Sequence, residues 1–163
     1  MFRYQLVVLC IAFIVCNSTD NSFCEFKDCY IKAVNRTDKF MTLYIKLYQT
    51  PVDNVTANIK LMRNNNGFKP FFLDVTIDAC RFLVNQKNKI IREFYFKLYK
   101  KYSNMNHTCP YDHDLLFPQL WTRYLEDTLE GFVPLVGGEY ALYTTWYSKN
   151  IKRASVNIYF SIF

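Results

Sequence analysis

Histidine and cysteine occur close together at His107 and Cys109, and this pair could form a nucleophilic site. A cysteine nucleophile requires a nearby base such as histidine, and it must be a free thiolate. In an oxidising compartment, which the N-terminal sequence described below indicates, a cysteine is far more often half of a disulfide. We therefore expect Cys109 to be disulfide-bonded, and we predict no catalytic residue and no enzyme.

A second group of reactive side chains follows in the same stretch. Its members are of the types that bind zinc, namely His107, Asp112, His113 and Asp114. Their spacing matches no established zinc motif, and neighbouring residues seldom converge on one ion. We interpret the group as an ordered surface loop, and we predict neither a metal site nor a cofactor.

Two carboxylates, Asp74 and Asp78, are four residues apart in a strand-like run. Paired carboxylates perform acid–base catalysis when they lie within about 5–10 Å of each other. Four residues along a strand span about 13 Å. The two side chains are therefore too far apart to act on one bond, and we expect them on a solvated strand face.

The N-terminus has the layout of a secretory signal peptide. A short basic segment at residues 1–3 precedes the apolar run LVVLCIAFIV at 6–15, and the chain turns polar at Asn17. The run is about half the length that a membrane-spanning helix requires. We predict a signal peptide at residues 1–16, cleavage near residues 16–18, and one secreted, extracellular domain at 19–163.

The remaining cysteines and the glycosylation signals indicate the same compartment. The cysteines that would remain after cleavage are Cys24, Cys29, Cys80 and Cys109. An even number behind a signal peptide predicts disulfides, with three possible pairings between which the spacing does not choose. Glycosylation sequons lie at Asn35, Asn54 and Asn106.

The composition says more about the interior than about the surface. The chain of 163 residues carries a net charge of +6, but its lysines are scattered, so we predict no nucleic-acid partner. It contains 15 phenylalanines and 13 tyrosines, which is far more large apolar surface than a domain of this size usually has. Either the core is large, or apolar surface is reserved for a ligand or a partner.

Most of the chain has the two-residue alternation of β-strands with one buried face. The alternating runs cover residues 41–48, 55–62, 68–80, 139–147 and 153–163, with a shorter run at 23–30. An Asn-Gly turn at 64–67 predicts a hairpin between the second and third of these runs. Residues 115–129 have no clear period, and either a strand followed by a loop or a short helix from Gln119 fits them. Many antiparallel strands in a secreted chain predict a two-sheet β-sandwich.

The period changes to that of a helix at about residues 86–102. Ile91, Phe94 and Leu98 recur at intervals of three and four residues, which predicts an amphipathic helix with one apolar face. Asn85 or Asn88 can cap its N-terminus. We expect this helix to be inserted into the sandwich.

Four sequence strings resemble a known family. They are CYIKAVNRT, GFKPFFLDVTIDACRFL, YSNMNHTCPYDHDLL and GGEYAL, in this order. They resemble a large family of small secreted insect proteins that is catalogued as a domain of unknown function. This family is similar to the CheB chemosensory proteins and, through them, remotely to the ganglioside-activator and ML lipid-recognition fold. The match covers residues 29 to 160.

The resemblance implies an immunoglobulin-like, ML-like antiparallel β-sandwich that can hold a lipid or other hydrophobic small molecule between its sheets. It also implies a role in contact chemosensation, with a membrane receptor or channel as a further partner. The chain departs from the family pattern in two places: Cys24 and Cys29 are unusually close together, and residues 117–134 are idiosyncratic.

We expect a hydrophobic ligand to contact the inward faces of three strands and the apolar helix face. These residues are Phe71, Leu73, Val75, Ile91, Phe94, Leu98, Leu142, Trp146, Val156 and Ile158. The alternative for each is ordinary core, in a secreted β-sandwich that binds another protein and no small molecule. For the disulfides we favour Cys80–Cys109, which closes a loop of about 30 residues.

Overall fold

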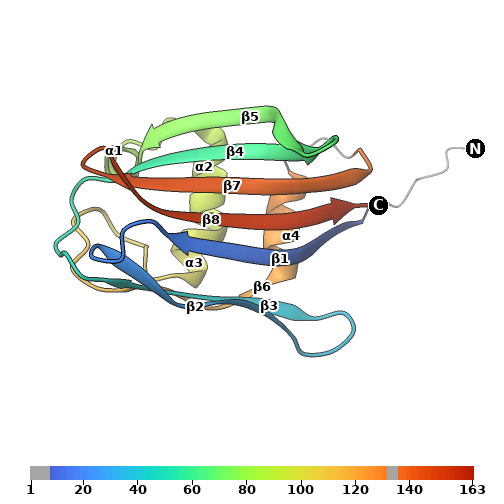
Figure 1. Cartoon of the computed structure of the whole chain (residues 1–163), viewed down its shortest axis with the longest axis horizontal. Helices are drawn as coiled ribbons and strands as arrows, with labels where there is room; N and C mark the ends of the chain where they lie inside the picture. The colour runs from blue at the N-terminus through green and yellow to red at the C-terminus, as the bar shows by residue number, and fades with distance from the viewer. Residues whose placement is uncertain (1–7, 132–135) are drawn as a thin grey trace, which may run out of the picture.

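The computed structural model describes residues 8–131 and 136–163 and contains two antiparallel sheets (Figure 1). The five-stranded sheet has the order β1 (Leu9–Ser18), β8 (Ile151–Ile162), β7 (Gly138–Ser148), β4 (Thr56–Asn64), β5 (Phe68–Asp78). The three-stranded sheet has the order β2 (Cys24–Ala33), β3 (Lys39–Leu47), β6 (Leu115–Trp121). The predicted mainly β fold, with a sandwich architecture, is confirmed.

The Asn-Gly hairpin also forms as predicted. β4 and β5 pair antiparallel, and the turn between them places Asn66 at φ 53° and Gly67 at φ 106°. Both angles are in the left-handed region, which asparagine and glycine tolerate best. The side-chain oxygen of Asn64 accepts a hydrogen bond from the Gly67 N–H at 3.1 Å and stabilises the turn.

The predicted helix forms in three consecutive parts: α2 (Lys89–Phe94), a π-helical turn η1 (Tyr95–Tyr99) and α3 (Lys100–Tyr102). Asn88 is the cap, because its side-chain oxygen accepts a hydrogen bond from the Ile91 N–H at 3.1 Å. Glu93 and Lys97, four residues apart, form an ion pair at 3.0 Å.

The structure contains two further helices, whereas the sequence analysis predicted a single one. α1 (Ala79–Val84) begins where we expected β5 to continue, because the Asp78 carboxylate caps it by accepting a hydrogen bond from the Arg81 N–H. In the ambiguous stretch, β6 is followed by α4 (Thr122–Glu130). Pro118 is accommodated in β6 because this strand lies at a sheet edge.

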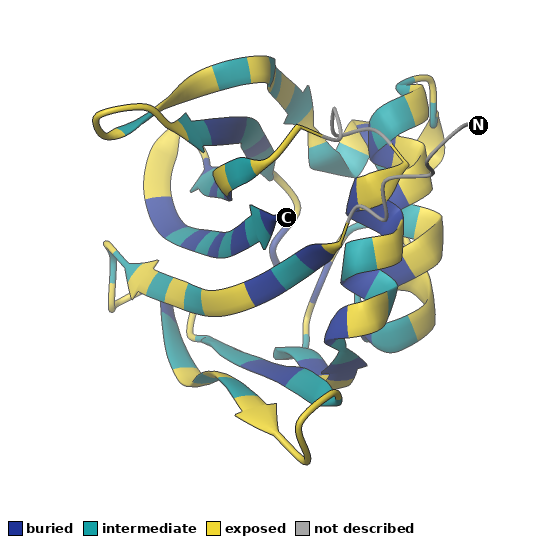
Figure 2. Cartoon of the chain, turned by 90° about the vertical axis from the view of Figure 1, so that its right-hand side faces the viewer, coloured by how far each residue is buried: buried dark blue, intermediate teal, exposed yellow. Residues whose placement is uncertain are grey.

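The helices lie together on one side of the two sheets, where they cover the space between them (Figure 2). Buried side chains from both sheets meet the helices there, and the core includes Leu43, Leu61, Leu98 and Leu125. On the other side the sheets approach through β1 and β2, which the Cys16–Cys29 disulfide links with Cα atoms 6.3 Å apart. The interior is thus closed by a covalent link on one side and by helices on the other.

The cysteine pairing agrees with the sequence analysis in one bond and differs in the other. Cys80 and Cys109 form the favoured disulfide. Cys24, which we expected in a disulfide, is a free buried thiol, and Cys29 pairs with Cys16 instead. Cys24 and Cys29 lie five residues apart on β2, which is about 16 Å along a strand. Disulfides require Cα atoms within about 7 Å, so these two cannot pair.

Most of β1, residues 9–16, belongs to the segment that the sequence analysis assigns to the signal peptide. It pairs with β8 along its length, from Leu9 opposite Ile162 to Ser18 opposite Ala154. Residues 1–7 of the predicted signal peptide lie outside the described residues. Cleavage near residues 16–18 stays a prediction, and it would remove both this strand pairing and the cysteine bonded to Cys29.

In the part of the chain that the structure describes, no helix has the length and apolar character needed to cross a membrane.

Candidate functional site

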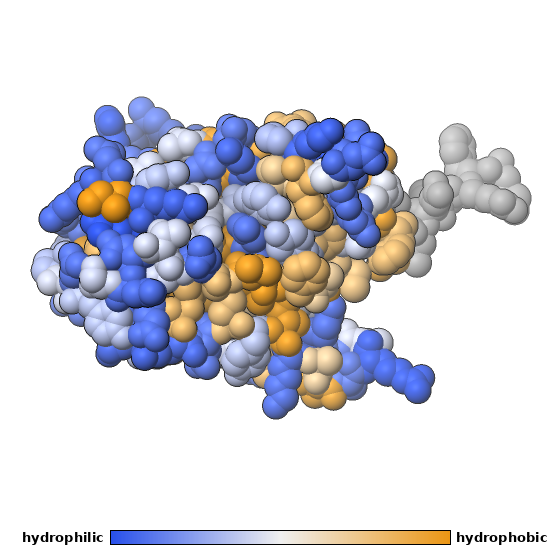
Figure 3. Space-filling model, viewed as in Figure 1, coloured by the Kyte–Doolittle hydropathy of each residue, from blue (hydrophilic) through white to orange (hydrophobic). Residues whose placement is uncertain are grey.

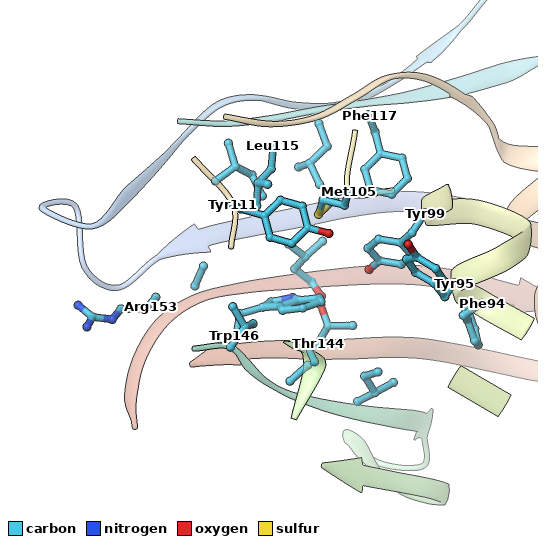
Figure 4. Close-up of a pocket in the computed structure, with 18 of the residues that line it drawn as sticks. Phe94, Tyr95, Tyr99, Met105, Tyr111, Leu115, Phe117, Thr144, Trp146 and Arg153 are labelled. Atoms are coloured by element: carbon cyan, nitrogen blue, oxygen red, sulfur yellow. The ribbon is translucent and has the colours of Figure 1, made fainter. Parts of the chain in front are cut away.

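An apolar cavity of about 240 Å³ lies between the two sheets and the helices (Figure 4). Seven of the predicted ligand-contacting residues line it, namely Ile91, Phe94, Leu98, Leu142, Trp146, Val156 and Ile158. They come from η1 and α2 on the helical side, and from β7 and β8 in the large sheet. The inward faces of these elements, identified by their periodicity, therefore meet at one cavity.

The three predicted residues of β5 do not line this cavity. Phe71 packs instead against Tyr140, with ring centroids 6.0 Å apart, and the Arg63 guanidinium lies 5.4 Å above its ring. Phe71 and Leu73 pack against the main core. β5 is the edge strand of its sheet, and its cavity-lining residue is Ile77, near its C-terminal end. Phe71, Leu73 and Val75 thus lie outside the cavity lining, and their contact with a ligand stays a prediction.

The sequence analysis missed the wall that the small sheet contributes. Met41, Leu43, Ile45 and Leu47 of β3 all line the cavity. Their alternation was visible in the sequence and predicted a buried face. The sequence did not show that this face lines the same cavity as Trp146, because the partner of each sheet face is decided by tertiary packing.

The π-helical turn brings two further residues to the cavity. The Lys100 N–H donates to the Tyr95 carbonyl five residues earlier, where an α-helix would use the residue four earlier. Tyr95 and Tyr99 line the cavity together with Phe94 and Leu98. Single-turn π-helical segments are frequent at functional sites. Residues 91, 94, 95, 98 and 99 have the spacing of one apolar helix face, so the sequence contained this signal although our prediction named only Ile91, Phe94 and Leu98.

At one end of the cavity, the polar groups have partners within the protein. The buried Arg153 forms an ion pair of 2.6 Å with Asp20 and donates to the Ser148 carbonyl at 3.3 Å. Its guanidinium also lies 4.3 Å from the Phe23 ring centroid. Hydrogen bonds from Ser22 and from Arg153 lower the pKa of the Asp20 carboxyl. The charge at this end is therefore balanced, and its polar groups are paired within the protein.

The polar groups in the middle of the cavity also have hydrogen-bond partners within the protein. The Trp146 indole N–H donates to the Thr144 hydroxyl at 3.1 Å, and that hydroxyl donates to the Val156 carbonyl at 2.7 Å. The Tyr111 hydroxyl donates to the His107 carbonyl. Burial nevertheless raises the pKa of Tyr111 to about 12.

The tyrosines of the π-helical turn differ from these groups. The Tyr99 ring packs edge-on against Phe117, with centroids 5.2 Å apart. Burial raises the pKa of Tyr99 to about 12 and also raises the pKa of Tyr95. Tyr99 still keeps part of its surface accessible. Because the dense surroundings desolvate the phenol, we interpret this accessible surface as facing the cavity and not bulk water.

The side chains near His107 that could bind zinc form hydrogen bonds within the protein. The two Nε2 atoms of His107 and His113 are 2.7 Å apart. Asp114 accepts hydrogen bonds from the Tyr44 hydroxyl and the Leu47 N–H, and these bonds lower its pKa. Among residues 8–131 and 136–163, no three metal-binding side chains converge on one point.

The remaining sequence candidates lie on the surface. Asp74 and Asp78 are exposed, and Asp74 accepts a hydrogen bond from the Asn58 amide at 3.0 Å. The sequon residues Asn35, Asn54 and Asn106 are also exposed. Their glycosylation stays a prediction.

The fold and the site define a β-sandwich with an apolar cavity between its sheets. Residues 57–142, just over half of the chain, match the family described as "Protein of unknown function (DUF1091)". The chain belongs to this family. A comparison with curated proteins finds no match.

Proposed function

We propose that the protein is a secreted carrier or co-receptor that holds a lipid-like or other hydrophobic ligand between its two sheets. The observation that carries this proposal is the apolar cavity, which receives side chains from both sheets and the helices. An engineered apolar cavity of about 150 Å³ accepts benzene. At the same volume per atom as in that cavity, about 240 Å³ holds roughly ten carbon atoms.

The resemblance to the CheB proteins and to the ML lipid-recognition fold supports a role in chemosensation, with a membrane receptor or channel as the partner of the loaded protein. The proposal includes no catalytic step. The cysteine beside His107 is bonded to Cys80, so it provides no thiolate.

The proposal is tested by native mass spectrometry and lipid extraction of the protein purified from the medium of secreting cells. We expect an apolar molecule to co-purify, or an added one to change the fluorescence of Trp146. A ligand-free protein that binds no apolar probe would contradict the proposal. The same mass spectra give the N-terminus, and a mature chain that begins at residues 17–19 would leave Cys29 without Cys16.

A second candidate, a sandwich that binds another protein, is favoured by one surface feature. Aromatic rings cross the outer face of the large sheet: Phe13 stacks on Tyr159 at 4.4 Å, and Phe68 packs edge-on against Tyr159 at 5.3 Å. Phe13 is 52% exposed. Apolar surface gathers near β1 in Figure 3. Failure of all ligand binding together with specific binding of a receptor ectodomain would favour this candidate.

A further inference from the structure

The hydroxyl groups of Tyr95 and Tyr99 are the unusual feature of the cavity. Both phenol rings extend from the π-helical turn into it (Figure 4). In the described part of the chain, neither hydroxyl has a hydrogen-bond partner, and each ring has aromatic contacts only. Every fully buried side-chain nitrogen and oxygen atom in the described residues has a partner, so these two hydroxyls keep some accessible surface, which we assign to the cavity that both residues line. Polar groups inside a protein are normally paired, because an unpaired one costs about 1–3 kcal/mol.

The rest of the cavity follows that rule. The polar groups of Tyr111, Thr144, Trp146 and Arg153 all bond to protein atoms. The two unpaired hydroxyls thus form a local polar site in an otherwise apolar cavity. Ligand sites commonly have this composition, in which a few polar groups fix the orientation of an apolar molecule.

We propose that Tyr99, with Tyr95 beside it, donates a hydrogen bond to an oxygen atom of the bound ligand. The ligand class is a neutral apolar molecule with one acceptor oxygen, such as an ester, ketone, aldehyde or alcohol. This inference rests on the proposed function, and it specifies the chemistry of the ligand and its direction in the cavity.

The charges around the cavity exclude a carboxylate at this position. Among the described lining residues Arg153 is the single charged side chain, and it lies at the opposite end, bonded to Asp20 (Figure 4). A carboxylate beside Tyr99 would be a buried charge without a counter-ion, which is strongly unfavourable. The desolvation that raises the pKa of Tyr99 to about 12 would act against that charge too, and it keeps the phenol protonated as a donor.

The test uses the secreted full chain with Trp121→Phe, so that Trp146 in the cavity wall is the single tryptophan. The probes are methyl octanoate, octane and octanoate, and their binding is followed by Trp146 fluorescence. We expect Tyr99→Phe to weaken the binding of methyl octanoate about five- to tenfold, which corresponds to one net hydrogen bond. It should change the affinity for octane less than twofold. Octanoate at neutral pH should bind at least about tenfold more weakly than the ester.

Tyr95→Phe is the second variant, and it should show the same selectivity to a smaller extent. The matched control is Tyr102→Phe, which removes a hydroxyl from the same helical segment but outside the lining. It should leave the affinity for all three probes unchanged. Circular dichroism confirms that each variant is folded.

The infrared stretch of a carbon-13-labelled ester carbonyl gives an independent measurement. The bound ester should absorb at a lower frequency in the parent protein than in Tyr99→Phe, because a hydrogen bond weakens the carbonyl bond. If ester and alkane bind but both tyrosine variants affect them equally, the inference is overturned and the proposed function stands. If no probe binds the parent protein, the proposed function fails, and the inference fails with it.

Discussion

The cavity ends at Arg153 on one side and at Tyr95 and Tyr99 on the other (Figure 4). Both ends place polar groups in apolar surroundings. At the Arg153 end the carboxylate of Asp20 and the carbonyl of Ser148 satisfy the guanidinium. At the tyrosine end no described residue satisfies the hydroxyls. The polar groups at the Arg153 end are therefore paired without a ligand. At the tyrosine end, a ligand would supply the missing hydrogen-bond acceptor.

The largest expected effect comes from a disulfide whose Cys109 lines the cavity. The Cys80–Cys109 disulfide joins the start of α1 to the loop that carries Tyr111, and its half-cystines are 29 residues apart. In the chain-entropy model, Cys80→Ser lowers the free energy of unfolding by roughly 3–4 kcal/mol. Urea unfolding of the secreted protein measures this change. The control is Cys24→Ala, which alters a free cysteine that lies beyond the predicted cleavage site; an equal loss there would show that the disulfide is not the cause.

The tyrosine end should be sensitive to alkaline pH. Burial raises the folded-state pKa of Tyr99 to about 12, whereas an unfolded tyrosine ionises near 10. The resulting stabilisation is complete below about pH 10 and is lost as the pH rises through about 12. A difference of about two units corresponds to roughly 3 kcal/mol. The unfolding free energy of Tyr99→Phe should therefore fall less steeply over this pH range, and parallel curves would show that the phenol is not desolvated.

The Arg153 end should matter for stability and not for ligand choice. Arg153→Met leaves the Ser148 carbonyl without its donor and removes the guanidinium from the Phe23 ring. We expect the free energy of unfolding to fall by about 1–3 kcal/mol. The ratio of ester to alkane affinity should stay within about twofold of the parent value. A lost preference for the ester would mean that the ligand oxygen lies at the Arg153 end.

The smallest expected effect is a difference in unfolding free energy between variants of two cavity tyrosines, Tyr111 and Tyr99. Tyr111→Phe removes the donor to the His107 carbonyl, and we expect a loss of about 1 kcal/mol in the free energy of unfolding. Tyr99→Phe removes no hydrogen bond to a described residue, so the ligand-free protein should lose nothing or gain stability. Chemical unfolding of both variants without ligand decides between them, and an equal loss in the two would reveal a protein partner for Tyr99.

The strands and the helix that form the cavity could largely be predicted from the sequence. The alternation of Val156, Ile158 and their neighbours identified β8, and the three-to-four spacing of Ile91, Phe94 and Leu98 identified the apolar face of the helix. These patterns are local, because a single face of each element is buried. They identify buried positions, but they cannot tell a filled core from a cavity.

The sequence by itself determined β2 to β5, β7 and β8, the Asn-Gly hairpin, the amphipathic helix and the mainly β sandwich class, but it assigned most of β1 to a signal peptide and left β6 open. The tertiary structure alone decided that Cys29 pairs with Cys16 and not with Cys24, because the distance along β2 forbids the local bond. It also decided that Phe71 lies on an edge strand while Trp146 and β3 line one cavity. Finally, it decided that Tyr95 and Tyr99 line a cavity and not a filled core, because the space beside a helix face depends on elements that are distant in the sequence.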